Sequence, residues 1–425
     1  MEQKFYPQVG ETLYTGKLPC GLQVAVLPRP GFTKKLCYFV TDFGAIHTDF
    51  TMDGKDYTVP AGVAHYLEHK LFDMPGRDVV EEFSAMGAVP NAFTGYDMTA
   101  YYFSCTEHFY ENLRLLLEFV TTPYFTEESV AKEQGIIGQE IGMNEDSPEN
   151  RLFELLMGAM YEKHPIRTPI LGTRESIAQI TPQVLETCHR AFYRPENMLL
   201  CVVGDADPDQ IGEIAEEMLK NMPHPQVTAV RRWDEKLTVF TPSVDRQMEV
   251  AMPMFHLGFK CDPLPDGDEG VRREIIGDLA SEALFGESSP LYLKLYEQGL
   301  IDASFGGGFE TVEGMAMLTC TGDSEDPQAV RDAILTQAKA LSETGISEAD
   351  FLRMKRSALG RRIRNMDSFD STCFRICAYH FSQFDYFRIP DIYAQVTCED
   401  IRQFLRTVID PDNMCMAVIY PKEET

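Results

Sequence analysis

The chain has 425 residues, 44% of them hydrophobic and 24% charged, a composition typical of a soluble globular protein. Its formal net charge of −28 argues against nucleic acid or an anionic membrane surface as a partner. No apolar run approaches the roughly 20 residues of a transmembrane helix, and Met1–Leu18 lacks the pattern of a secretory signal.

Eleven cysteines occur without a Cys-x-x-Cys pair, so we expect reduced thiols in a cytoplasm. Cys373 and Cys377 lie one helical turn apart, and we interpret them as packing residues.

In chain order, the first half begins with strand patterns and continues with helical ones. Residues 21–27 and 36–43 are apolar or alternate as strands do, and residues 61–72 have helical periodicity. Residues 91–105 are rich in Thr, Tyr and Phe, which favours a further strand. Helical patterns follow at 106–121, 127–145 and 149–161. Strands mixed with long helices, without strict β-α-β alternation, predict an α+β fold.

An internal repeat relates the two halves of the chain. The segments 181–203 and 397–419 have Thr, Arg, Pro and Asn-Met at equivalent positions. Each of these residues in the second segment lies 216 positions after its counterpart in the first. Each copy predicts a helix with a Thr N-cap, a Pro-centred turn and a buried strand. Residues 221–245 contain three prolines among polar residues, as linkers do. We therefore expect two homologous α/β sandwich domains, 1–230 and 231–425, each with a mixed or antiparallel sheet packed with helices.

The run His65-Tyr-Leu-Glu68-His69 lies on the predicted helix 61–72. Because positions i and i+4 share a helix face, both imidazoles can reach one metal ion. Glu68 lies on the same side and can accept a proton from a water molecule held by the metal. This is the inverted zincin pattern His-x-x-Glu-His, and two imidazoles plus one carboxylate suit zinc. The alternative, a chance match on a solvated helix, is the false-positive risk of any short motif.

The third ligand is expected on the helical segment 126–146, for which Thr126 is the predicted N-cap. Two of its acids, Glu133 and Glu140, are seven residues apart and face the same way. Glu140 lies in the more apolar surroundings, Gly-Ile-Ile-Gly-Gln-Glu-Ile-Gly, which favours an inward-facing carboxylate. From the residues alone, Glu140 is the better candidate and Glu133 stays open as the other.

These motifs resemble the pitrilysin/insulinase family of zinc metallopeptidases, over essentially the whole chain. The matching residues are Val59–Phe72, Asn91–Thr94, Thr99, Tyr101, Tyr102, Glu133 and Glu140. The resemblance implies that His65, His69 and Glu140 bind one zinc ion, that Glu68 is the general base, and that Glu133 orients a ligand histidine. It also implies that Asn91, Ala92, Phe93 and Thr94 form a sheet edge to which an extended substrate peptide adds by main-chain hydrogen bonding.

By the same resemblance we expect hydrolysis of peptides or small unfolded polypeptides in an enclosed chamber, as in the bacterial cytosolic processing-peptidase branch. Projected by 216 positions, His65, Glu68 and His69 fall on Ser281, Leu284 and Phe285, and Asn91–Thr94 falls on Gly307–Glu310. The second half is therefore expected to be an inactive copy that serves substrate contact and assembly.

The family often carries an Arg/Tyr pair in its inactive domain, whereas Ala303–Gly322 contains neither residue type. By analogy we expect a heterodimer with a related zinc-less subunit; a homodimer is the alternative. Two further alternatives concern function. One alternative is a dedicated protease that removes leader segments from one precursor peptide. The other is a non-catalytic assembly subunit, and the intact motif argues against it.

Overall fold

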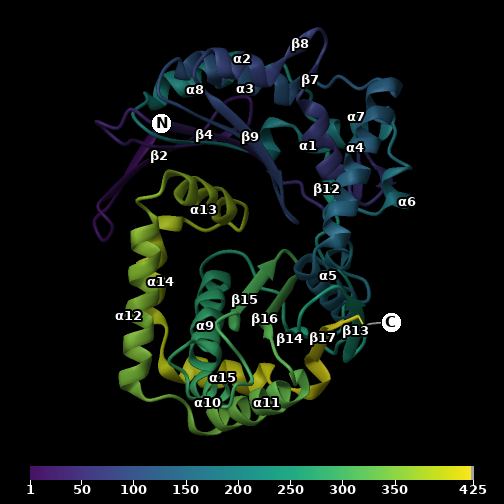
Figure 1. Ribbon diagram of the computed structural model, residues 1–425. Helices are drawn as coiled ribbons and strands as arrows, with labels where there is room; N and C mark the ends of the chain where they lie inside the picture. The colour runs from purple at the N-terminus through teal and green to yellow at the C-terminus, as the bar shows by residue number, and fades with distance from the viewer. Residues whose placement is uncertain (423–425) are drawn as a thin grey trace. The chain divides into compact units, whose positions relative to one another are not determined.

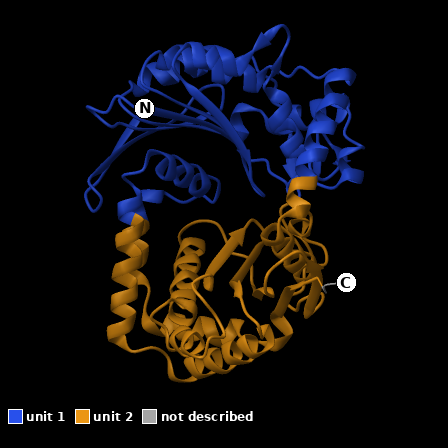
Figure 2. Cartoon of the chain, viewed as in Figure 1, with its two compact units in different colours: residues 1–141, 169–230, 363–388 blue, residues 142–168, 231–362, 389–425 orange. Residues whose placement is uncertain are grey.

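The computed structural model of the protein describes residues 1–422 (Figure 1). They form two compact units (Figure 2), each assembled from three segments. Unit 1 comprises 1–141, 169–230 and 363–388, and unit 2 comprises 142–168, 231–362 and the residues from 389 on. Each unit combines a sheet with helices, which confirms the predicted two-domain α+β fold.

The main sheet of unit 1 has seven strands within the described chain, and β9 lies at one of its edges. In spatial order the strands are β1 (Glu2–Tyr6), β2 (Glu11–Lys17), β3 (Gln23–Leu27), β11 (Met198–Val203), β4 (Lys35–Thr41), β10 (Thr99–Cys105) and β9 (Val89–Thr94). Strand β11 is parallel to β3, and the other pairs are antiparallel. Two small sheets accompany it, formed by β5 (Asp49–Met52), β6 (Lys55–Thr58) and β12 (Val227–Ala229), and by β7 (Asp73–Met74) and β8 (Arg77–Asp78).

Helices cover one face of this sheet and enclose its apolar core. They are α1 (Val63–Leu71), α2 (Val79–Ala85), α3 (Phe109–Thr121), α4 (Glu127–Asp146), α6 (Arg174–Ile177), α7 (Pro182–Phe192), η2 (Pro195–Asn197) and α8 (Pro208–Leu219). The other face receives α13 (Phe369–Phe381), which contacts β4 and β11 (Figure 1). There Cys201 forms hydrogen bonds with Cys373 and Cys377, so a third cysteine does lie beside the two that we interpreted as packing residues.

Unit 2 repeats the central part of this architecture. Its sheet, within residues 1–422, has the order β13 (Ser243–Met248), β17 (Met414–Pro421), β14 (Met254–Cys261), β16 (Met315–Asp323) and β15 (Gly306–Val312). Again one pair is parallel, β13 with β17, and the others are antiparallel. Its helices are α5 (Pro148–Met160), η1 (Pro165–Arg167), α9 (Asp268–Phe285), α10 (Pro290–Glu297), α11 (Pro327–Thr344), α12 (Glu348–Asn365), α14 (Ile389–Gln395), α15 (Cys398–Val408) and η4 (Pro411–Asn413). The sheet β3-β11-β4-β10-β9 therefore recurs as β13-β17-β14-β16-β15.

Each half of the sequence contributes one segment to the compact unit of the other half. The proposed boundary near residue 230 coincides with the division between Val230 and Arg231, yet 142–168 belongs to unit 2 and 363–388 to unit 1. These segments are equivalent, because Ser147 and Ser368 cap α5 and α13 in the same way and lie 221 positions apart. Helix α5 packs on β14 and β17 of unit 2. The apolar face of such a helix does not specify which of two similar sheets it will cover, so the sequence alone did not predict this exchange.

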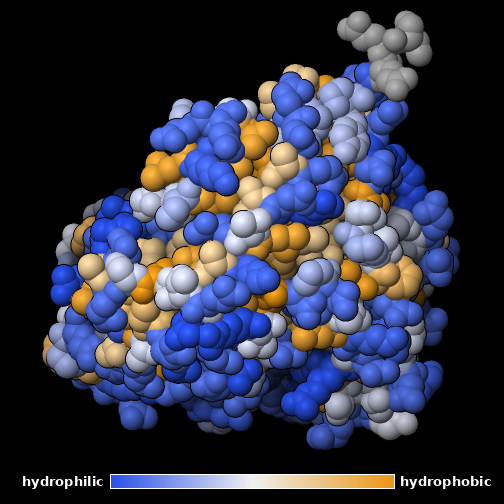
Figure 3. Space-filling view, turned by 90° about the horizontal axis from the view of Figure 1, so that it is seen from below, coloured by the Kyte–Doolittle hydropathy of each residue, from blue (hydrophilic) through white to orange (hydrophobic). Residues whose placement is uncertain are grey.

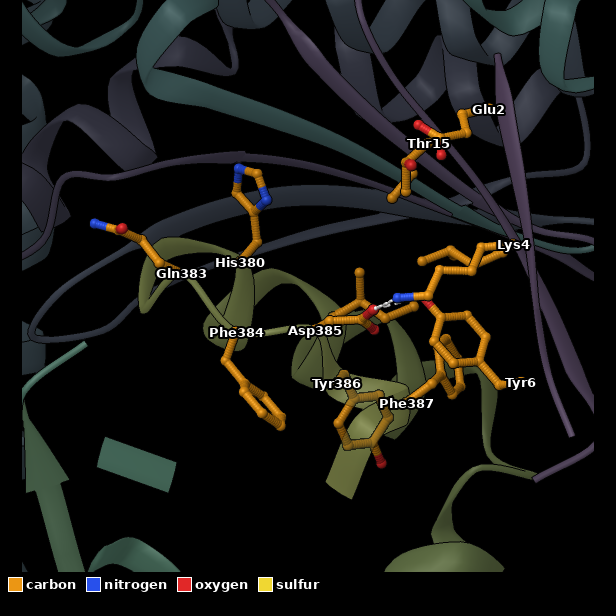
Figure 4. A pocket seen from close by; sticks show the side chains of 13 residues that line it. Glu2, Lys4, Tyr6, Thr15, His380, Gln383, Phe384, Asp385, Tyr386 and Phe387 are labelled. Carbon is orange, nitrogen blue, oxygen red and sulfur yellow. Dashed lines mark hydrogen bonds and ion pairs between the residues drawn. The ribbon is translucent and has the colours of Figure 1, made fainter. Parts of the chain in front are cut away.

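The segment 363–388 is also fixed at the β1 edge of the unit 1 sheet. Asp385 Oδ2 accepts hydrogen bonds from Lys4 Nζ at 2.6 Å and from the Tyr6 hydroxyl at 2.7 Å, beside a cavity of about 510 Å³ (Figure 4). Elsewhere on the molecule, the face drawn in Figure 3 is mostly hydrophilic, with apolar side chains interspersed. No helix among the described residues is long and apolar enough to cross a membrane.

Candidate metal centre

Helix α1 presents the motif residues, and close backbone packing fixes where the helix begins. Its N-cap Gly62 has φ 91°, and a Cβ there would lie 2.5 Å from the carbonyl oxygen of Leu171. Only glycine tolerates this conformation and approach. Ser176 Oγ donates to the carbonyl oxygen of Ala61 at 2.8 Å, which adds a second link to the same loop. The start of α1 is therefore held against residues 171–176.

Helix α4 lies beside α1 and is held by two hydrogen bonds. The fully buried Tyr66 of α1 donates its hydroxyl proton to the carbonyl oxygen of Val130 in α4. Arg174 donates from Nη1 to the carbonyl oxygen of Gly138 at 2.7 Å. The expected N-cap is also present, since Thr126 Oγ1 accepts from the backbone N–H of Ser129. These contacts set the register in which acids of α4 face the histidines.

Three of the predicted residues converge on one point. Atoms of His65, His69 and Glu140 lie within 4.8 Å of one another. Glu140 Oε2 is 3.6 Å from His65 Nε2 and 3.7 Å from His69 Nε2. These separations are too long for hydrogen bonds and close to the about 3.4 Å between ligands of a tetrahedral zinc ion with metal–ligand bonds of about 2.0–2.1 Å. Two imidazole nitrogens and a carboxylate oxygen are a donor set that zinc accepts, so the residues present fit this ion.

Glu133 lies on the other side of the His69 ring. Its Oε1 is 2.9 Å from His69 Nδ1, the distance of a good hydrogen bond. A histidine that binds a metal through one nitrogen commonly donates from the other to such a carboxylate, which fixes the ring orientation. Of the two acids that the sequence left open, Glu140 thus lies beside the Nε2 atoms, and Glu133 lies beside Nδ1 of His69.

Burial and neighbouring charges perturb the ionisation of this cluster. Burial, with a smaller contribution from His69, lowers the pKa of His65 to about 3, so its imidazole is neutral at pH 7. Burial also opposes charge on His69, but the hydrogen bond with Glu133 and the nearby carboxylates outweigh it and raise its pKa. Burial raises the pKa of Glu68, against the effect of a hydrogen bond from Thr94. Perturbed carboxyl and imidazole groups in one cluster are typical of a functional site.

The predicted substrate-binding residues are divided between the two faces of the edge strand β9. Thr94 Oγ1 donates to Glu68 Oε2 at 2.7 Å, and Ala92 packs against the core on the same face. Phe93 points the other way, because successive side chains of a strand alternate, and its ring centroid is 5.9 Å from that of Phe374 in α13. Asn91 shares the face of Phe93 and accepts from the backbone N–H of Ala92. Within residues 1–422, β9 pairs only with β10, so its outer main-chain groups are open to a further strand.

Strand pairing shows which residues of unit 2 correspond to this site. In unit 1, Thr94 pairs with Thr99, Thr99 pairs with Thr41, and Thr41 pairs with Met198. In unit 2, Phe309 pairs with Leu318, Leu318 pairs with Phe259, and Phe259 pairs with Met414. Since Met414 is the repeat counterpart of Met198, Phe309 is the counterpart of Thr94. The projection of Thr94 onto Glu310 was therefore wrong by one residue.

The helix carrying the motif is also shifted relative to the projection. A Cβ on Gly277 would lie 2.3 Å from the Phe309 ring, so Gly277 occupies the position at which Glu68 meets Thr94. The same 209 positions separate His65 from Glu274, Glu68 from Gly277, and His69 from Asp278. The projection onto Ser281, Leu284 and Phe285 was thus wrong, because the hairpin β5–β6 lengthens the first half before α1.

Unit 2 holds an ion-pair cluster where unit 1 has His65, His69 and Glu140. Arg362 Nη2 lies 2.9 Å from Glu274 Oε1 and 2.8 Å from Asp278 Oδ2. Arg362 belongs to α12, the counterpart of α4, since Thr126 and Ser347 cap these helices 221 positions apart. It lies one position beyond the counterpart of Glu140. Two acids at i and i+4 with a guanidinium thus replace two histidines and a glutamate, a substitution that the sequence projection missed.

A fold of two related sheets, one of which bears an His-x-x-Glu-His helix and a facing glutamate, is the arrangement expected of a duplicated domain of the peptidase class. Comparison with known proteins agrees: residues 55–174 match the insulinase model of peptidase family M16, and residues 179–358 match the inactive-domain model of peptidase M16. The chain belongs to this insulinase (M16) family, as its motifs predicted.

Relatives and solved structures extend this similarity over nearly the whole chain. An uncharacterised zinc protease of Bacillus subtilis, YmfH, is 37% identical over 98% of both chains. A crystal structure described as an M16-like peptidase of Alicyclobacillus acidocaldarius matches with a TM-score of 0.92 at 30% identity, covering 97% of this chain and 99% of that one. A protease of Helicobacter pylori, at 18% identity and a TM-score of 0.80 over 96% and 99% of the two chains, shows the same fold.

Proposed function

We propose that this protein is a zinc-dependent endopeptidase that cleaves peptides or small unfolded polypeptides. The observation that carries this proposal is the convergence of His65, His69 and Glu140 beside Glu68, on a chain whose relatives are named zinc proteases. His65, His69 and Glu140 would hold the ion, one per chain. A bound zinc ion supplies Lewis acidity, which polarises a carbonyl group and lowers the pKa of a neighbouring water molecule.

The chain's own residues supply proton transfer and orientation. Glu68 takes a proton from the attacking water and passes it to the departing amine, as a general base and then a general acid. Glu133 accepts the Nδ1 proton of His69 and thereby fixes the orientation of that ring. His65 is neutral at pH 7 because burial lowers its pKa, so its nitrogen lone pair is available. The open edge of β9 provides main-chain groups to which an extended peptide can add as a strand.

Metal analysis combined with peptide cleavage tests this function. The purified chain is expected to retain about one zinc ion and, with any required partner, to cleave unstructured peptides in a chelator-sensitive way. A chain that binds no zinc, or whose cleavage survives the Glu68→Gln substitution, would contradict the proposal.

We further propose that a related zinc-less subunit completes the enzyme. The support is the absence of Arg and Tyr from Ala303–Gly322, where related inactive domains often carry such a pair. Gel filtration with an activity assay tests this: full activity of the chain alone, as a homodimer or monomer, would refute it. A narrow role in removing leader segments from one precursor is the second candidate, and broad cleavage of unrelated peptides would count against it.

A further inference from the structure

Thr94 contacts the proposed base directly. Its Oγ1 donates a hydrogen bond of 2.7 Å to Glu68 Oε2, and it is the last residue of the edge strand β9. Strand pairing with Thr99 fixes its backbone, while Glu68 sits on a helix whose start is itself held. The hydrogen bond therefore joins two rigid elements and restrains the carboxylate between them.

The second half of the chain provides an internal comparison for this contact. Its counterparts of Glu68 and Thr94 are Gly277 and Phe309, and the Phe309 ring fills the space beside Gly277. The second half therefore lacks both the carboxylate and the hydroxyl at these positions. If the hydroxyl served only strand formation or peptide binding, its presence would not need to follow that of the carboxylate.

We propose that Thr94 is a positioning residue for Glu68, rather than a substrate-binding residue as its place in the Asn91–Thr94 motif suggested. This inference rests on the proposed function. By engaging Oε2, Thr94 holds the carboxylate in one orientation and leaves Oε1 to exchange the proton. A hydrogen bond to an ionised group is stronger than one between neutral groups, so it fixes the side chain effectively.

Two substitutions that differ in the hydroxyl test the role. Thr94→Val keeps the shape and removes the donor, whereas Thr94→Ser keeps the donor. With the metal-loaded protein and any required partner, Thr94→Val is expected to lower kcat about 10- to 100-fold, with KM within about twofold and zinc content unchanged. Thr94→Ser is expected to restore most of kcat. A loss that appears in KM, or a Thr94→Ser enzyme as slow as Thr94→Val, would overturn the proposal in favour of peptide binding or strand packing.

A double-mutant cycle adds a readout that does not depend on turnover. In the metal-free chain, Thr94→Val is expected to lower the unfolding temperature in the parent but not in a Glu68→Ala background. Equal shifts in both backgrounds would refute the coupling. The proposed function fails separately, if the parent chain binds no zinc or if Glu68→Gln remains fully active; the unfolding cycle still decides whether Thr94 and Glu68 are coupled.

Discussion

Two equivalent helix pairs of this chain bring different sets of ionisable side chains together. In α1 and α4, two imidazoles and a carboxylate face one another at 3.6–3.7 Å without hydrogen bonds between them. In α9 and α12, two carboxylates accept from the guanidinium of Arg362 at 2.8–2.9 Å. In the second cluster, the two carboxylates are paired with the guanidinium of Arg362. The first cluster is a set of electron-pair donors that would suit an added metal cation. Within one scaffold, the identity of three or four side chains therefore decides between a candidate metal site and a structural ion pair.

The largest expected difference between the two helix pairs is in the zinc content of the protein after one side chain is removed from each pair. His65→Ala is expected to reduce zinc from about one ion per chain to almost none, because two remaining protein ligands hold zinc weakly. Glu274→Ala, the matched change in unit 2, is expected to leave zinc content unchanged. Metal analysis after dialysis measures both, and retention by His65→Ala or loss from Glu274→Ala would break the comparison.

Glu68→Gln is expected to lower kcat by about 10²–10⁴-fold, because the amide cannot accept a proton. Zinc content should stay as in the parent chain, since Glu68 is not among the converging donors. Glu128→Gln is the control, because Glu128 is an exposed acid in the first turn of α4. Peptide cleavage rates measure the effect of both substitutions. A strong effect of Glu128→Gln would show that the loss of activity comes from removing negative charge in this region rather than from removing a general base.

The residues facing Glu68 and Gly277 should differ in what they contribute to stability. Phe309 is only 8% exposed, so Phe309→Ala is expected to destabilise the fold by about 3–5 kcal/mol through lost burial and a cavity. Its counterpart change, Thr94→Val, should cost less than about 2 kcal/mol, the scale of one hydrogen bond. Urea unfolding measures both, and equal costs would mean that Phe309 does not fill the space inferred for it.

Arg362→Met is expected to destabilise the protein by about 1–3 kcal/mol, because it leaves two partly buried carboxylates without their guanidinium. The neighbouring Arg361 is half exposed and 3.4 Å from Glu282, so Arg361→Met should cost less than about 1 kcal/mol. Urea unfolding with metal analysis checks both variants. A fall in zinc content with Arg362→Met would show that the clusters are not independent.

Local patterns in the sequence predicted much of the fold and singled out the residues that form the candidate metal centre. The helix expected at 61–72 is α1, and the one expected at 127–145 is α4. The Thr N-caps of Thr126, Thr181 and Thr397 are present, because capping depends on neighbouring residues alone. The strand expected at 91–105 is instead the hairpin of β9 and β10, since its turn at 95–98 was not recognised.

Features that depend on insertions or on three-dimensional packing were not predictable in this way. A constant offset of 216 holds near the end of each half, but the β5–β6 hairpin shifts the motif helix, so the counterparts of His65 and Glu68 became clear only from strand pairing. Likewise, the hydrogen bond from Thr94 to Glu68 joins residues 26 positions apart, and no local pattern indicates it.

The exchange of 142–168 and 363–388 between the halves has a consequence for separating them. A chain cut after Val230 would yield one fragment whose sheet lacks α13 and another whose sheet lacks α5. Each fragment would then expose an apolar sheet face and carry the helix that fits the other, so we expect the fragments to reassemble in trans rather than to fold as independent modules.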